Sequence, residues 1–207
     1  MDITWTGSER LLNWKLRVTG DSSTEAEFEK WLFVSISSVI FGRKAGELLS
    51  LTSNQFDLPL AQRLACVAQL VESWDLSSHV LYQTAFATQV IIYRAEQVQE
   101  VLTTVSPCIL SCTLNYVCGL DPAAFLAEVA RRWQETGDIP HEIGLALGYP
   151  IKDVLGYMGV LSLPCTCCCG WRVYGDPAPS LDRSRAFVAA RQQALFFLHA
   201  PGVPASA

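Results

Sequence analysis

Residues 79–93 read HVLYQTAFATQVIIY, and this stretch decides the fold. His79–Tyr82 and Gln89–Tyr93 are rich in the β-branched and aromatic residues that favour strands. Only the short segment Gln83–Thr88 separates them, so the pattern predicts an antiparallel hairpin. The chain around this hairpin has the periodicity of helices instead. The sequence therefore predicts a small sheet in a mainly helical protein.

Helical signals flank the hairpin on both sides. Thr24 and Glu27 form a capping-box pattern at the start of one helix, and Asp121-Pro122 is typical of another helix start. Further helices are expected over 8–18, 58–74, 95–105, 107–118, 141–147, 150–157 and 181–198. The segment 42–51 is expected to hold a turn and a short helix, and 170–174 a third strand.

These elements predict the class α+β: a mainly helical single domain with a small, partly antiparallel sheet of about three strands. The length of 207 residues fits one domain. We expect residues 1–23 to form an N-terminal appendage, residues 24–198 the domain, and residues 199–207 a frayed tail.

The composition excludes two classes of protein. Half of the residues are hydrophobic and only 17% are charged, which excludes intrinsic disorder. The net charge is −5 and the 15 basic residues are scattered, with Arg183, Arg185 and Arg191 as the densest group. Nucleic-acid binding needs a concentrated basic face, so we expect none.

The apolar segments also indicate where the protein acts. Trp31–Phe41 is apolar but contains three serines and is followed directly by Gly-Arg-Lys, so it is too short to span a bilayer. The N-terminal residues MDITWTGSER have neither the basic nor the apolar region of a secretory signal. We therefore expect a cytoplasmic protein without membrane insertion, whose thiols stay reduced.

Three blocks carry a family resemblance: SSVIFGRKAGEL at 37–48, PHEIGLALGYPIKDVLGY at 140–157 and GWRVYGD at 170–176. In this order they resemble the uncharacterised family called domain of unknown function number 3793. The chain differs from the family pattern at Ser38 and Ala45, where the family has proline, and at Arg172, where it has lysine. The resemblance implies the cytoplasm of an anaerobic bacterium and implies no particular activity.

His141-Glu142 is the first candidate site. A zinc protease motif needs His-Glu-x-x-His, and Leu145 stands where the second histidine would be. One interpretation is structural, since Glu142 in a first helical turn suits the helix dipole. The other is a ligand contact or an acid/base role, because histidine titrates near neutral pH.

The other polar residues of the blocks lie at helix starts and corners. Tyr149 lies in a Gly-Tyr-Pro corner between two helices, Asp153 in the first turn of the second one, and Lys44 just after a glycine. Packing and capping explain each of them locally. The alternative is a ligand-binding surface made by Lys44, His141, Glu142, Tyr149 and Asp153.

Eight cysteines include a cluster of four in Cys165–Cys169. Cys165 and Cys168 form a C-x-x-C pair, and Cys108 with Cys112 offers a second pair for a tetrahedral metal site. Redox-active thiols and inert, buried thiols are the alternatives. The remaining cysteines are Cys66, Cys118, Cys167 and Cys169.

Three functions follow from these features. The first is a cytosolic accessory protein that binds a ligand or a partner and has no catalysis of its own. The second is a protein that binds zinc or iron, or acts in redox chemistry, through the cysteine cluster. The third is an enzyme with His141 and Glu142 as acid and base. No G-x-G-x-x-G, P-loop or G-x-S-x-G motif indicates a cofactor or a nucleophile.

Overall fold

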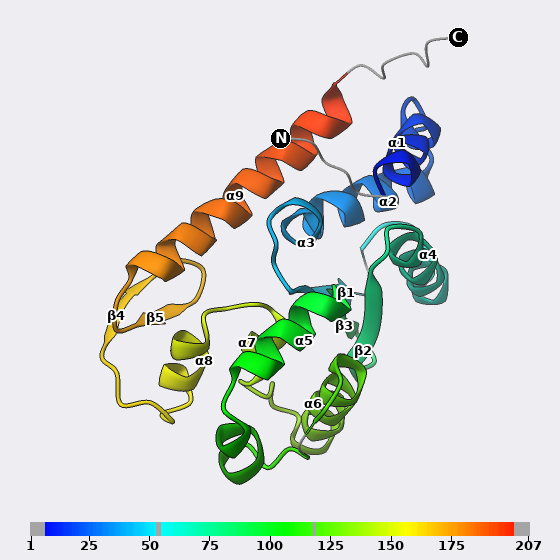
Figure 1. The fold of residues 1–207 in the computed structure, drawn as a ribbon. Coiled ribbons are helices and arrows are strands. Elements are labelled where there is room, and N and C mark those ends of the chain that lie inside the picture. The colour runs from blue at the N-terminus through cyan, green and yellow to red at the C-terminus, as the bar shows by residue number, and fades with distance from the viewer. Residues whose placement is uncertain (1–6, 53–54, 118, 201–207) are drawn as a thin grey trace.

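The computed structural model describes residues 7–52, 55–117 and 119–200. Helices dominate these residues, and five strands form two antiparallel sheets (Figure 1). The elements in chain order are α1 (Gly7–Val18), α2 (Thr24–Ser35), α3 (Ser37–Phe41), β1 (Gly46–Thr52), α4 (Leu60–Ser73), β2 (Ser77–Gln83), β3 (Ala87–Tyr93), α5 (Ala95–Thr104), the π-helical turn η1 (Ile109–Thr113), α6 (Pro122–Thr136), α7 (Ile143–Ala146), α8 (Ile151–Tyr157), β4 (Cys165–Cys168), β5 (Arg172–Tyr174) and α9 (Ala178–His199).

The predicted hairpin is present as β2 and β3, and the class is α+β as expected. The order in the larger sheet is β1-β3-β2, with β3 antiparallel to both neighbours. The short helix expected within 42–51 is wrong, because β1 occupies most of this segment and pairs with β3 from Gly46↔Tyr93 to Thr52↔Ala87. Pairing with the hairpin overrides the helix propensity of its leucines.

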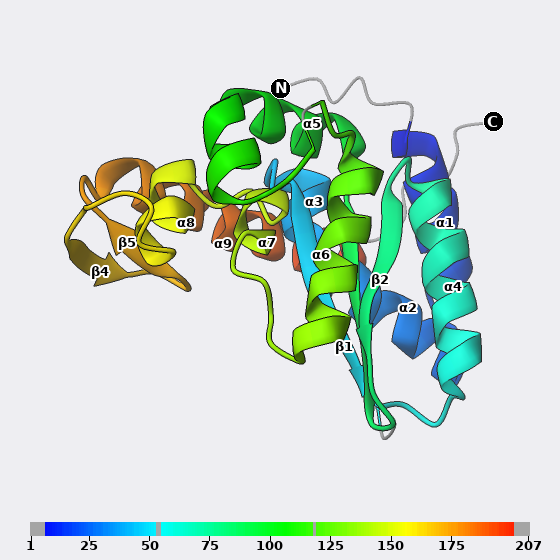
Figure 2. The same ribbon diagram turned by 90° about the horizontal axis from the view of Figure 1, so that it is seen from below.

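Helices cover both faces of the larger sheet, so the domain has two hydrophobic cores (Figures 1 and 2). Val90 and Ile92 of β3 face the first core, with α1, α2 and α4. Ile91 and Tyr93 face the second core, with α5, α6 and α7. β3 is thus the central strand and is buried on both faces, which explains its uninterrupted apolar run.

The helices nearest to the two ends of the described chain both reach the first core. Leu11, Trp14 and Val18 of α1 are buried in the first core, although the sequence suggested an appendage here. The predicted tail lies, from residue 201 on, outside the described residues. Figure 1 shows α9 running from the smaller sheet towards α1, and Ala194 near its C-terminal end is buried in the first core.

Helix starts follow the capping signals closely. The Asp121 carboxylate accepts a hydrogen bond from the backbone nitrogen of Ala124 and caps α6 as predicted. Ser23, rather than Thr24, caps α2, since its hydroxyl oxygen accepts from the backbone nitrogen of Ala26. None of the described helices combines the length and the apolar composition that a membrane crossing requires.

Candidate functional site

A cleft of about 620 Å³ opens between the α7–α8 corner and the β4–β5 hairpin, with the start of β1 as its third wall. This volume lies within the range of small-molecule sites. The three blocks singled out in the sequence all contribute to it. The lining residues that carry the argument are Glu47, His141, Tyr149, Asp153, Trp171 and Arg172.

The corner between α7 and α8 is fixed by backbone geometry. Gly148 has a φ of 72°, in the left-handed region that favours glycine. A Cβ at this position would lie 2.8 Å from the backbone nitrogen of Ala45, so the corner packs directly on the chain entering β1. Pro150 then precedes the first residue of α8. Tyr149 is thereby held at the turn, next to β1.

An aromatic pair forms one wall of the cleft. The rings of Tyr149 and Trp171 stack with centroids 4.6 Å apart and an interplanar angle of 19°. The same two residues line a second, smaller cleft of about 300 Å³ on the α9 side, together with Phe187. The pair therefore separates the two clefts. Burial raises the pKa of the Tyr149 hydroxyl, and Glu47 and Cys169 add to this effect.

Lys44 lies behind this pair and is not a free cation. Its ammonium donates to both carboxylate oxygens of Glu47 at 3.0 Å, and Ser38 Oγ donates to Glu47 Oε2 at 2.6 Å. The ammonium also lies 5.5 Å from the ring centroid of Tyr149 and 5.2 Å from that of Phe187. Lys44 thus joins the site as one member of a mostly buried ion pair that supports Tyr149.

Asp153 is fully buried and ties three elements together. Its Oδ1 accepts from Lys152 Nζ at 2.6 Å and from the backbone nitrogen of Tyr174 at 2.8 Å. Its Oδ2 accepts from Ser180 Oγ at 2.6 Å and from Trp171 Nε1 at 2.8 Å. α8 is thereby connected to β5, to α9 and to the indole that lines the cleft.

These four hydrogen bonds decide the charge of Asp153. Burial alone would raise the pKa of this carboxyl group, because it disfavours the charged form. The hydrogen bonds from Lys152, Ser180, Tyr174 and Trp171 outweigh burial, so the pKa is lowered overall. Asp153 therefore lies at the cleft as a carboxylate that is already paired and that positions Trp171.

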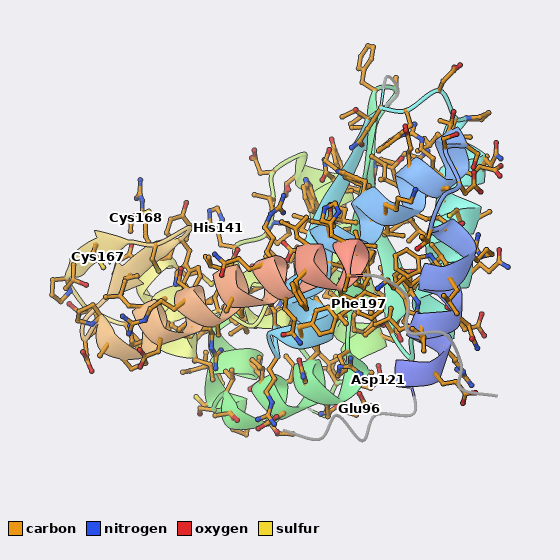
Figure 3. All side chains as sticks on the ribbon, turned by 90° about the horizontal axis from the view of Figure 1, so that it is seen from above. Glu96, Asp121, His141, Cys167, Cys168 and Phe197 are labelled. Atoms are coloured by element: carbon orange, nitrogen blue, oxygen red, sulfur yellow. The ribbon has the colours of Figure 1, made fainter. Side chains whose placement is uncertain are left out.

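The mouth of the cleft carries polar groups of another kind, and we call His141, Tyr157 and Arg172 the rim. Both of the others contact Tyr157: the His141 ring meets it edge-on at 4.8 Å, and the Arg172 guanidinium lies 5.7 Å from its ring centroid. All three side chains are exposed. Figure 3 shows His141 on the side of the molecule that also carries Cys168, which lines the same cleft.

Glu142, the neighbour of His141, is turned away from the cleft. Its buried Oε1 accepts from Tyr116 Oη at 3.0 Å and from Arg132 Nη1 at 2.9 Å. Burial, followed by the nearby carboxylate, raises the pKa of Tyr116. The structure therefore does not bring His141 and Glu142 together, and Glu142 connects the start of α7 to α6.

The four cysteines suggested as metal ligands do not meet in one site. Cys165 and Cys168 lie on β4, while Cys108 precedes the turn η1 and Cys112 lies within it, and all four are exposed. Within residues 7–52, 55–117 and 119–200, no group of three or more His, Cys, Asp or Glu side chains is arranged to hold a metal ion. Cys118 lies outside the described residues.

Three residues of the site were missed at the level of sequence: Glu47, Trp171 and Arg172. All of them are within the blocks quoted above, so their position in these blocks was the available signal. Glu47 follows Lys44 by three residues, and the two form an ion pair where the chain enters β1. The stacking of Trp171 on Tyr149 depends on the contact between the β4–β5 hairpin and α8, which no local pattern encodes.

Comparison with known proteins identifies the family. The model of the family described as "Protein of unknown function (DUF3793)" matches residues 32–201. Because this match covers most of the chain, the protein belongs to this family. No curated protein and no solved structure gives a significant match.

Proposed function

We propose that this protein is an accessory protein that binds a small organic molecule in the cleft between the α7–α8 corner and the β4–β5 hairpin. It has no catalysis of its own and acts in the cytoplasm of an anaerobic bacterium, without membrane insertion or nucleic-acid binding. The observation that carries the proposal is the convergence of three separate sequence blocks on one cleft of about 620 Å³.

The lining of this cleft favours binding of an apolar body. Its walls are largely aliphatic and aromatic, with a small number of polar side chains among them, which is the usual composition of small-molecule sites. The apolar lining residues are Leu48, Ile139, Ile143, Leu147, Val154 and Trp171.

The three acids at or behind the cleft support binding more than catalysis, and Glu47 among them is paired with Lys44. Asp153 accepts four hydrogen bonds within the chain, and Glu142 is engaged with Tyr116 and Arg132 behind the cleft. A general base needs an available oxygen for the proton that it abstracts, and these two carboxylates already accept hydrogen bonds within the chain. We therefore assign Asp153 a positioning role and leave Glu142 out of the binding site.

The proposal is tested with a neutral fluorescent probe, N-phenyl-1-naphthylamine, and a variant that fills the cleft. Ile139 lines the cleft and is 38% exposed, so Ile139→Trp adds an indole to the cleft with little disturbance of the core. We expect the probe's affinity to fall about tenfold or more, because its rings lose the apolar walls.

A matched control is Leu12→Trp on α1, where Leu12 is 37% exposed and lies outside the cleft. It adds the same indole to a similarly exposed position and should leave the affinity unchanged. If Ile139→Trp and Leu12→Trp bind the probe as the wild type does, the cleft is not the binding site.

A further inference from the structure

We infer that the ligand of this cleft is an organic oxyanion: an apolar body that rests on the cleft walls and an acidic group that meets Arg172 at the rim. This inference rests on the proposed function and specifies the class of ligand. It is carried by the distribution of paired and unpaired charges around one cavity.

The negative charges that line the cleft are neutralised within the protein. Glu47 forms an ion pair with Lys44 at 3.0 Å, and Asp153 forms one with Lys152 at 2.6 Å. A cationic ligand would have to compete with these two ammonium groups for acceptors that are already used. The cleft therefore offers no available counter-ion to a cation.

Arg172, the positively charged side chain at the mouth, differs from these paired carboxylates. Among the residues that the structure describes, none forms a hydrogen bond or ion pair with the side chain of Arg172, and its recorded contact is the ring of Tyr157. Its guanidinium can donate two parallel hydrogen bonds to a carboxylate or phosphate. His141 contacts the same tyrosine ring edge-on and lines the same cleft.

The position of Arg172 on β5 holds this charge at the mouth. The next residue, Val173, is fully buried, and side chains alternate between the two faces of a strand. Arg172 therefore points away from the buried side, towards solvent, while it still lines the cleft. A ligand whose apolar body contacts Trp171 would carry its acidic group next to the guanidinium one residue further along.

The test compares two probes with the same aromatic body. 1-Anilinonaphthalene-8-sulfonate carries a sulfonate, and N-phenyl-1-naphthylamine lacks it. For Arg172→Gln we expect the affinity for the sulfonate probe to fall about fivefold to tenfold, the usual range for a lost charge-assisted hydrogen bond at a partly exposed site. The affinity for the neutral probe should fall much less, because this probe has no acidic group for Arg172 to meet. Arg172→Lys, which keeps the charge, should recover most of the loss.

Arg185→Gln is the matched control, because Arg185 is an exposed arginine on α9 that does not line the cleft. It should leave both affinities unchanged. If Arg172→Gln lowers the affinity for both probes equally, or for neither, the oxyanion inference is wrong. The proposed binding site would still hold if Ile139→Trp lowers the affinity for the neutral probe. An unchanged affinity in Ile139→Trp would instead overturn the proposed function.

Discussion

Two regions around the cleft contain polar and charged side chains, which are buried and hydrogen-bonded in one region and exposed in the other. Behind the cleft, the carboxylates of Asp153 and Glu142 are buried and hydrogen-bonded to partners from α6, β5 and α9. At the mouth, the side chains of His141 and Arg172 are exposed and contact only the ring of Tyr157 in the described structure. The comparison separates residues that hold the cleft in shape from residues that can meet a ligand.

The largest effect is expected for Asp153→Ala. The substitution leaves four donors without their acceptor, among them the hydroxyl of the fully buried Ser180, so the free energy of unfolding should fall by about 3 kcal/mol or more. Chemical denaturation checks this value. Because Trp171 loses the acceptor of its indole N–H, the affinity for N-phenyl-1-naphthylamine should fall as well.

The control for this variant is Asp182→Ala. Asp182 is exposed and forms an ion pair with Arg185 on the surface of α9, so its removal should change stability by less than about 1 kcal/mol. Equal effects of the two substitutions would contradict the role of Asp153 as a structural connection.

Glu142→Gln should lower the stability less than Asp153→Ala does. The side chain keeps its shape but loses its charge next to Arg132, so we expect a loss of about 1–2 kcal/mol in the free energy of unfolding. Probe affinity should be unchanged, because Glu142 does not line the cleft. Glu135→Gln on the exposed face of α6 is the control. Lost probe binding with unchanged stability would place Glu142 in the binding site.

The acid dependence of stability should show the smallest effect. The folded state lowers the pKa of Asp153, so this group stabilises the protein above its unfolded pKa of about 3.9 and loses that contribution as the pH falls further. Asp153→Asn cannot titrate. The difference in unfolding free energy between wild type and this variant should therefore narrow below about pH 4. A constant difference from pH 7 to pH 2.5 would show that the charge of Asp153 contributes nothing.

Sequence patterns predicted the local elements well and the contacts between them poorly. The hairpin β2–β3, the Asp121 cap and the glycine-ended corner at Gly148 follow from neighbouring residues alone. β1 does not, because its strand conformation depends on pairing with β3, about forty residues further along the chain. Helix propensity therefore favoured a helix in a segment that forms a strand.

The same limit applies to the site. Lys44, His141, Tyr149 and Asp153, which the sequence suggested as parts of one surface, all lie at or directly behind the cleft. Glu142 is adjacent to His141 in sequence, yet it points to Arg132 on α6. Adjacent residues at a helix start can face opposite sides, and only the packing of α6 against α7 decides which one is buried.

The central claim is that a ligand binds against Trp171, and ¹⁹F NMR of protein labelled with 5-fluorotryptophan tests it most directly. The resonance of Trp171 is identified by its loss in Trp171→Phe. On addition of N-phenyl-1-naphthylamine we predict that this resonance shifts, while those of Trp14 and Trp74, which pack on each other in the first core, stay in place. A shift of Trp14 or Trp74 with no change at Trp171 would contradict the account.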